Sequence, residues 1–174
     1  MILSGKEIQS KLGHEIIIEP FSINQLNPNS YNLTLHNELL IYTNSIIDMK
    51  HENKTEKLVI PKTGIVLQPG RVYLARTVEY TSSDYYVPIL EGRSSIARLG
   101  LFVHVSAGLG NVGSSGYWTL ELVATQQVRI YPDIQICQIY FQEIVGTYEL
   151  YSTKYKASTD TQPSYLYKEL QEKK

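Results

Sequence analysis

The residue types that could bind anions and move protons are concentrated in one stretch of this sequence, residues 90–122. The first part of the stretch carries two arginines and two serines around a turn that Gly92 opens: Arg93, Ser94, Ser95 and Arg98. Guanidinium groups match phosphate oxygens with paired hydrogen bonds, and hydroxyls and turn amides add further donors. This clustering indicates a phosphate-binding turn, although an Arg-Ser-Ser tripeptide alone is as compatible with solvated loop charges.

A carboxylate, Glu121, follows in the second part of the same stretch. In the strand predicted over residues 117–123, Glu121 lies on the face opposite Leu120 and Leu122. A carboxylate in such an apolar strand is either exposed to solvent or held in a pocket for proton transfer. The pattern alone favours the exposed interpretation, because glutamate is seldom fully buried.

The elements that must position these residues are predicted to be mainly β-strands. Ser4 and Glu7 form a capping-box pattern that predicts a short helix to about Leu12. Short apolar segments separated by Gly, Pro and Asn turns predict one domain, a sandwich or distorted barrel. The strands are expected at residues 31–36, 39–42, 57–60, 64–67, 72–77, 87–90, 101–105, 117–123, 134–144 and 148–151.

Composition limits the possible functions. The 174 residues suffice for one packed domain, with 43% hydrophobic residues and a net charge of −1. This small charge argues against general nucleic-acid binding, which depends on neutralising many phosphates. The single cysteine, Cys137, allows no internal disulfide, and the amino end shows no long apolar run or cleavable signal. We therefore expect a cytoplasmic protein that binds neither nucleic acid nor membranes.

Several further motifs extend the pattern over nearly the whole chain. They are MILSGKEI at the start, NPNSYNL at 27–33, EGRSSIARLG at 91–100, HVSAG at 104–108, YWTLE at 117–121, ICQI at 136–139, and a tail with Lys154-Tyr155 and Gln162-Pro-Ser164. In this order they resemble the dCTP deaminase family of the dUTPase-like superfamily. The resemblance implies a homotrimer of distorted β-barrels or jelly rolls of the dUTPase-like type, each with a short N-terminal helix and with active sites between subunits.

The resemblance also implies an activity, the zinc-independent hydrolysis of dCTP to dUTP and ammonia, which would feed dUMP and dTTP synthesis. Glu121 matches the family's general base, and Arg98 matches the arginine beside it. Ser94 and the backbone of Ala107 match the groups that hold the attacking water. The candidate residues for binding the nucleotide are Arg93, Ser94, Ser95, Arg98, Asn111, Thr119, Gln138, Tyr151 and Lys154.

Four positions depart from the family's pattern: Asn111, Ser114, Ser158 and Asp160. Asn111 replaces the usual aspartate and can bond a sugar hydroxyl, but it cannot act as a base. Asp160 would repel a nearby triphosphate. Two alternatives to the dUTP-forming enzyme therefore stay open. One is a bifunctional enzyme that yields dUMP and pyrophosphate, against which Asn111 counts, and the other is a nucleotide-binding regulator with weakened catalysis.

The sequence lacks the signature of a zinc-dependent deaminase. Zinc deaminases pair His-x-Glu with Pro-Cys-x-x-Cys, and this chain has His36 and Glu38 but only one cysteine, so no protein-bound metal is expected. Magnesium is expected to arrive on the nucleotide's triphosphate. His104 is interpreted as a core histidine.

The tail, residues 152–174, is either a partly disordered end or, as the resemblance implies, a cover for the nucleotide. dTTP is a candidate feedback inhibitor.

Overall fold

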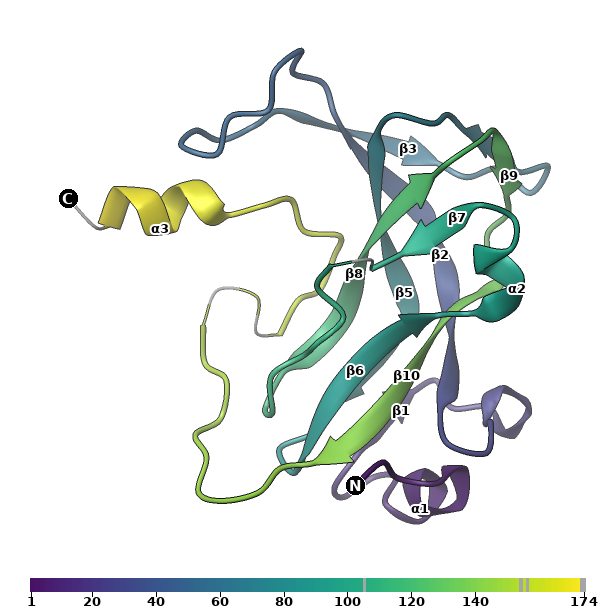
Figure 1. Ribbon diagram of the computed structural model, residues 1–174, viewed down its shortest axis with the longest axis vertical. Helices are drawn as coiled ribbons and strands as arrows, with labels where there is room; N and C mark the ends of the chain where they lie inside the picture. The colour runs from purple at the N-terminus through teal and green to yellow at the C-terminus, as the bar shows by residue number, and fades with distance from the viewer. Residues whose placement is uncertain (105, 154, 156, 173–174) are drawn as a thin grey trace.

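A computed structural model of the chain describes residues 1–104, 106–153, 155 and 157–172 (Figure 1). Its helices are α1 (Gly5–Ser10), the 3-10 helix η1 (Ile23–Gln25), α2 (Ser94–Ala97) and α3 (Leu166–Glu172). Its strands are β1 (Ile17–Glu19), β2 (Tyr31–Tyr42), β3 (Thr55–Val59), β4 (Ile65–Leu67), β5 (Val72–Ser82), β6 (Tyr86–Gly92), β7 (Leu101–Val103), β8 (Ser115–Ala124), β9 (Val128–Ile130) and β10 (Gln135–Glu143).

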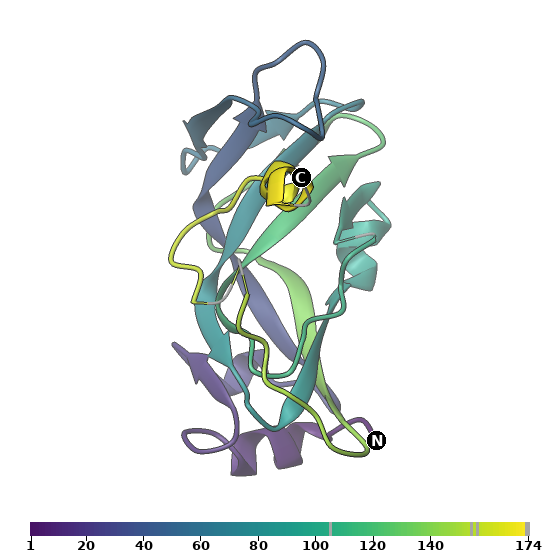
Figure 2. The same cartoon turned by 90° about the vertical axis from the view of Figure 1, so that its left-hand side faces the viewer.

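The strands form a distorted, nearly closed barrel, as Figures 1 and 2 show. The main sheet has eight strands, with the central order β6-β10-β2-β5-β8-β7, while β1 pairs with β5 and β3 with β2. Strands β4 and β9 form a separate pair. The two ends of the central order, β6 and β7, follow one another in the chain and are joined through α2. The predicted mainly β barrel with a short N-terminal helix is therefore confirmed.

Side-chain alternation explains why β8 presents Glu121 away from the core. Leu120 and Leu122 are fully buried in the core, whereas Thr119 and Glu121 on the opposite face are only partly covered. Burying a leucine side chain stabilises a fold by roughly 1.5–3 kcal/mol, so a register slip of one residue would expose both leucines. The core therefore fixes the direction in which Glu121 points.

Several predicted strand boundaries were wrong for identifiable reasons. The strands expected at 31–36 and 39–42 are one strand, β2, whose pairing with β5 is irregular between Leu35 and Leu39. Strand β5 continues past 77 to Ser82 through a similar irregularity. Irregular pairing breaks the period-two pattern without ending the strand. The three-residue strands β1 and β9 were missed.

The segment expected as a strand at 148–151 is not one. It lies beside the turn at 111–114, where the Tyr151 amide donates to the Val112 carbonyl at 2.8 Å, but it forms no ladder. The predicted turn after Gly92 is the four-residue helix α2. The strand expected at 101–105 ends at Val103 in β7, and residue 105 lies outside the described residues.

The described part of the tail is ordered against the barrel, which Figure 2 shows it crossing. Ser158 forms a parallel bridge with Gly116 at the start of β8, and its carbonyl accepts from the Tyr117 amide at 3.0 Å. Thr161 is buried, and the Gln162 amide donates to Thr119 Oγ1 at 2.9 Å. Lys154 lies outside the described residues. No described helix has the length and apolar character needed to cross a membrane.

Candidate active site

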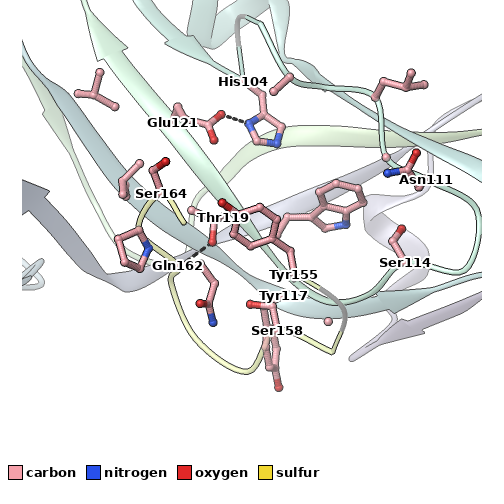
Figure 3. Close-up of a pocket in the computed structure, with 18 of the residues that line it drawn as sticks. His104, Asn111, Ser114, Tyr117, Thr119, Glu121, Tyr155, Ser158, Gln162 and Ser164 are labelled. Carbon is pink, nitrogen blue, oxygen red and sulfur yellow. Dashed lines mark hydrogen bonds and ion pairs between the residues drawn. The ribbon is translucent and has the colours of Figure 1, made fainter. Parts of the chain in front are cut away.

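A large cavity lies between β8, the glycine-rich segment before it and the tail (Figure 3). Its volume is about 1070 Å³. The cavity brings together five of the residues predicted from sequence: Ala107, Asn111, Thr119, Glu121 and Tyr151. Three tail residues, Tyr155, Ser158 and Gln162, complete one side. We refer to this space as the first cavity.

Glu121 faces the first cavity and is held by a histidine. Its Oε2 accepts a hydrogen bond from Nδ1 of His104, and Figure 3 shows the two side chains pointing toward one another. The His104 side chain is only 5% exposed, whereas that of Glu121 is 39% exposed. The His104 ring also packs edge-on against Trp118. A buried imidazole that donates to a carboxylate fixes its orientation, so Glu121 enters the cavity in a defined rotamer.

This role of His104 was missed by the sequence analysis. Its burial agrees with the interpretation as a core histidine, but its contact with Glu121 was not anticipated. The contact follows from strand register, because β7 and β8 pair with Val103 opposite Leu122. The next step along both strands brings His104 opposite Glu121, and the His104 amide indeed donates to the Glu121 carbonyl at 3.2 Å. Register was the signal that could have revealed the pair.

The turn at Asn111–Ser114 offers polar groups at the other end of the first cavity. The Ser114 amide donates to the Asn111 carbonyl at 3.0 Å, and Gly113 between them has a φ of +83°, which favours glycine. The Ser114 hydroxyl is buried and has no hydrogen-bond partner among the described residues. A buried unpaired hydroxyl in a cavity is available to a ligand hydroxyl. Ser114, one of the positions that depart from the family's pattern, therefore presents a polar group on the wall of the first cavity.

Two other predicted residues, Ser94 and Gln138, line a second cavity of about 560 Å³. His104 and Leu109 line both cavities, so the segment around them separates the two. Arg93, Ser95 and Arg98 line neither cavity. The predicted site is therefore divided within one chain, with Glu121 on one side of this segment and the phosphate-binding turn on the other.

The arginines of the predicted turn are not beside Glu121. Arg93 caps α2, and its Nη1 donates to the Gln135 carbonyl at 2.6 Å, which leaves its other N–H donors available. Arg98 ends α2 and is exposed, as are Ser94 and Ser95. Within one subunit Arg98 does not line the cavity that contains Glu121, because α2 precedes β7 whereas His104 and Glu121 lie at the far end of that strand.

Asp160, expected to repel a triphosphate, is paired with cations of the barrel. Its Oδ2 lies 2.7 Å from Lys57 Nζ, and its Oδ1 lies 3.7 Å from Arg76 Nε. The Lys57 hydrogen bond holds the pKa of Asp160 below its usual value, and the same bond raises the pKa of Lys57. The pairing reduces the repulsion that a bare carboxylate would exert.

The His-x-Glu sequence belongs to the same cluster. His36 Nε2 accepts from Arg76 Nη2 at 2.8 Å, so the ring is neutral. Burial lowers the pKa of His36, and the charge of Arg76 lowers it further. Among the described residues no group of three or more His, Cys, Asp or Glu side chains converges to hold a metal ion. His36 therefore helps to hold Arg76 in place.

Comparisons with known proteins identify a family and relatives that this chain resembles. A family described as dCTP deaminase-like matches residues 2–144. The "dCTP deaminase, dUMP-forming" of Hathewaya histolytica is 58% identical over 172 residues, which cover 98% of this chain and 100% of the relative. The protein of the same name from Clostridium acetobutylicum is 59% identical over 170 residues, 97% of this chain and 98% of the relative.

A solved structure supports the fold. The crystal structure of 2'-deoxycytidine 5'-triphosphate deaminase from Agrobacterium tumefaciens matches with a TM-score of 0.65 and 19% sequence identity. The match covers 82% of this chain and 48% of that protein, so this chain spans about half of the larger one. At this identity the likeness is one of fold.

Proposed function

Because this chain belongs to the dCTP deaminase-like family, we propose that it converts dCTP into dUMP, ammonia and pyrophosphate with the use of two water molecules. The main support is that relatives 58% and 59% identical over nearly their full lengths carry the name dUMP-forming. This bifunctional reaction replaces the dUTP-forming one as the favoured interpretation. Asn111 counted against the bifunctional reaction because its uncharged side chain cannot act as a base. Glu121, in the same cavity, is a carboxylate that can.

In the deamination step, Glu121 accepts a proton from the water that attacks the amine-bearing carbon of cytosine. Oε2 of Glu121 accepts the hydrogen bond from His104 Nδ1, and no described residue bonds Oε1. Oε1 is therefore the oxygen that accepts the proton from the water. The carboxyl group then returns the proton to the ring or to the departing ammonia. Asn111, Ser114 and Thr119 line the same cavity and are the polar groups available to the sugar and base.

The phosphate-binding turn would complete the site from a neighbouring subunit of a homotrimer. Two observations support this proposal: the turn and Glu121 line different spaces in one chain, and Arg98, Ser94 and Ser95 are exposed. Exposed apolar side chains, Leu99, Phe102 and Leu109, lie in the same region and would be covered by such contacts. Heterologous contacts that close a ring bring different patches of two copies together. A monomeric mass by light scattering would contradict this assembly.

Magnesium would enter on the triphosphate, where it neutralises phosphate charge and favours loss of pyrophosphate. The chain would contribute the donors of the phosphate-binding turn, with Arg93 and Arg98 as fixed cations and Ser94 and Ser95 as hydroxyl donors. Tyr151, which lines the first cavity, would contact the nucleotide from the tail side, together with Lys154.

Product analysis tests the proposal. The protein is incubated with dCTP and magnesium, and ammonia, pyrophosphate and nucleotides are quantified over time. We expect dUMP, pyrophosphate and ammonia in equal amounts. Accumulation of dUTP with ammonia would mean that the enzyme stops after deamination. Binding of dCTP without any product would favour a nucleotide-binding regulator, for which the altered residues Asn111, Ser114, Ser158 and Asp160 are the support.

A further inference from the structure

The Asn27–Asn32 motif lies next to the predicted phosphate-binding turn, although neither cavity contains it. The motif leads into β2, which pairs with β10, and β10 pairs on its other side with β6. Register places Gln138 of β10 opposite Asn32 on one side and Glu91 on the other. Side chains of β10 can therefore connect the motif to Gly92 and Arg93.

Gln138 makes this connection with both ends of its amide. Its Nε2 donates to the Gly92 carbonyl at 3.2 Å, and its Oε1 accepts from the Ser30 hydroxyl at 2.7 Å. An amide nitrogen has two protons, so the second N–H of Gln138 is available to a ligand in the second cavity, which Gln138 lines with Ser94. A flipped amide would instead present a carbonyl oxygen, which repels phosphate.

The direction of each hydrogen bond is fixed by its neighbours. The Gly92 carbonyl can only accept, so Gln138 must face it with nitrogen and face Ser30 with oxygen. Ser30 has one proton and gives it to Gln138, so its oxygen accepts from Asn27 Nδ2, at 3.1 Å. The network therefore has one polarity, with Asn27 as the donor at its start.

A second arm of the same network reaches Arg93. Asn27 Nδ2 gives its other proton to Asn32 Oδ1 at 2.9 Å, and Asn32 Nδ2 donates to Gln135 Oε1 at 2.9 Å. The backbone carbonyl of Gln135 accepts from Arg93 Nη1. Ser30 and Asn32 are both buried, so these bonds are shielded from competing water.

We propose that Asn27, Ser30 and Asn32 are positioning residues for phosphate binding, which fix the donor polarity of Gln138 together with the Gly92 carbonyl and hold Gln135 in place to accept from Arg93. None of the three touches substrate. They act by making Gln138 present N–H rather than C=O to the nucleotide's phosphates. The identity of the ligand in this inference rests on the proposed function. The polarity of the network follows from the hydrogen bonds alone.

Two substitutions test the polarity. Ser30→Ala removes the bond to Gln138 Oε1, and Asn27→Asp replaces the donor at the start of the network by an acceptor of the same shape. The introduced carboxylate would take the only proton of Ser30 and leave the Gln138 amide oriented by the Gly92 carbonyl alone. We expect either variant to weaken binding of a non-hydrolysable α,β-imido analogue of dUTP about tenfold, the effect of one hydrogen bond to a charged group.

Matched controls separate positioning from stability. Ser83 is also a buried serine, 3% exposed against 5% for Ser30, and its hydroxyl makes three hydrogen bonds far from the turn. Asn29 belongs to the same motif but is exposed. Ser83→Ala and Asn29→Asp should bind the analogue within about twofold of wild type. In steady-state assays Ser30→Ala and Asn27→Asp should raise the KM for dCTP while leaving kcat for ammonia release within about twofold, because Glu121 is in the other cavity.

Three results would overturn the proposal: unchanged analogue binding by Ser30→Ala and Asn27→Asp, an equal loss of binding by Ser83→Ala, or a fall in kcat with unchanged KM. Failure of the proposed function has a different signature, since wild type would then bind the analogue but release no ammonia or pyrophosphate. Exchange of the Gln138 side-chain amide protons, followed by NMR without ligand, gives a further readout. It should be at least about tenfold faster in Asn27→Asp than in wild type, and equal rates would contradict the inference.

Discussion

At the scale of single residues, Glu121 lies between a cavity and a buried imidazole. The bond from His104 holds one carboxylate oxygen and leaves the other toward the cavity. A carboxylate that is preorganised in this way needs no rearrangement before it accepts a proton. The pair therefore supplies both the base and its orientation within one strand hairpin, β7 and β8.

Replacing Glu121 by glutamine tests this role directly. Glu121→Gln keeps the shape of the side chain and removes the base, so ammonia release from dCTP should fall by about 10²–10⁴-fold. Binding of a dCTP analogue should stay within about threefold of wild type, measured by calorimetry. Glu149, an exposed glutamate just before the tail, provides the control Glu149→Gln, which should retain full activity. Rapid turnover by Glu121→Gln would rule out the mechanism.

The structure divides residues predicted from sequence between two cavities. Glu121, Asn111, Thr119, Ala107 and Tyr151 do share one cavity. Arg98, expected beside Glu121 in a site between subunits, does not line this cavity within one chain. Motif order along a chain carries no information on which subunit supplies a residue. The pairing of His104 with Glu121 was invisible for a different reason, because period-two patterns give the face of a residue but not its partner on the next strand.

At the scale of elements, the tail is attached to the barrel by a strand-like contact and an ion pair. Ser158 pairs with Gly116, whose φ of +125° and close contact with the Ser158 backbone leave no room for a side chain. Asp160 then pairs with Lys57 of β3. Tail residues line one side of the first cavity, which Glu121 also lines.

Loss of the ion pair should loosen the tail modestly. The side chains of Lys57 and Asp160 are 54% and 42% exposed, and such pairs contribute only about 0.2–1 kcal/mol. Asp160→Asn should therefore raise the rate of proteolytic cleavage in the tail by about twofold to fivefold. Asp84→Asn, at another exposed aspartate, should leave the rate unchanged. Equal rates for both variants and wild type would show that the pair does not hold the tail.

The same pair predicts a pH dependence of definite sign. Because Lys57 lowers the pKa of Asp160, the carboxylate stabilises the attached tail above its ordinary pKa of 3.8. This contribution is lost as the pH falls through the lowered pKa. Cleavage of the wild-type tail by an acid-stable protease should accelerate in that range, and Asp160→Asn should remove the pair's share of the acceleration. An identical pH profile for the variant would contradict this assignment.

Strand positions were predicted well where alternation is regular and poorly where it is not. The apolar alternation of β8 predicted its core face, and the structure confirms it. Strand β2 was divided in two because its pairing with β5 is irregular near Asn37. The tail at 148–151 has strand-like composition but contacts only one turn. Composition indicates which segments can adopt an extended conformation. A strand also needs the unpaired edge of a neighbouring strand with which to form hydrogen bonds.

At the scale of the whole molecule, the core surrounds the only cysteine of the sequence. Cys137 is fully buried in β10, and this burial raises the pKa of its thiol. The native protein should therefore react with a thiol reagent at least about a hundredfold more slowly than the protein in guanidinium chloride. The rate in native buffer then reports opening of the barrel. Fast native labelling would contradict the burial of β10.

The separation of Glu121 from the phosphate-binding turn has a genetic consequence. If each active site draws these two parts from different subunits, a copy that carries Glu121→Gln and a copy that carries Arg98→Ala are defective for different reasons. In trimers assembled at random from equal amounts of both, about one quarter of the interfaces would join an intact turn to an intact Glu121. Two inactive proteins would thus complement each other when they are unfolded and refolded together, whereas neither would reduce the activity of wild-type copies, because each variant keeps the part that a wild-type copy needs from its neighbour.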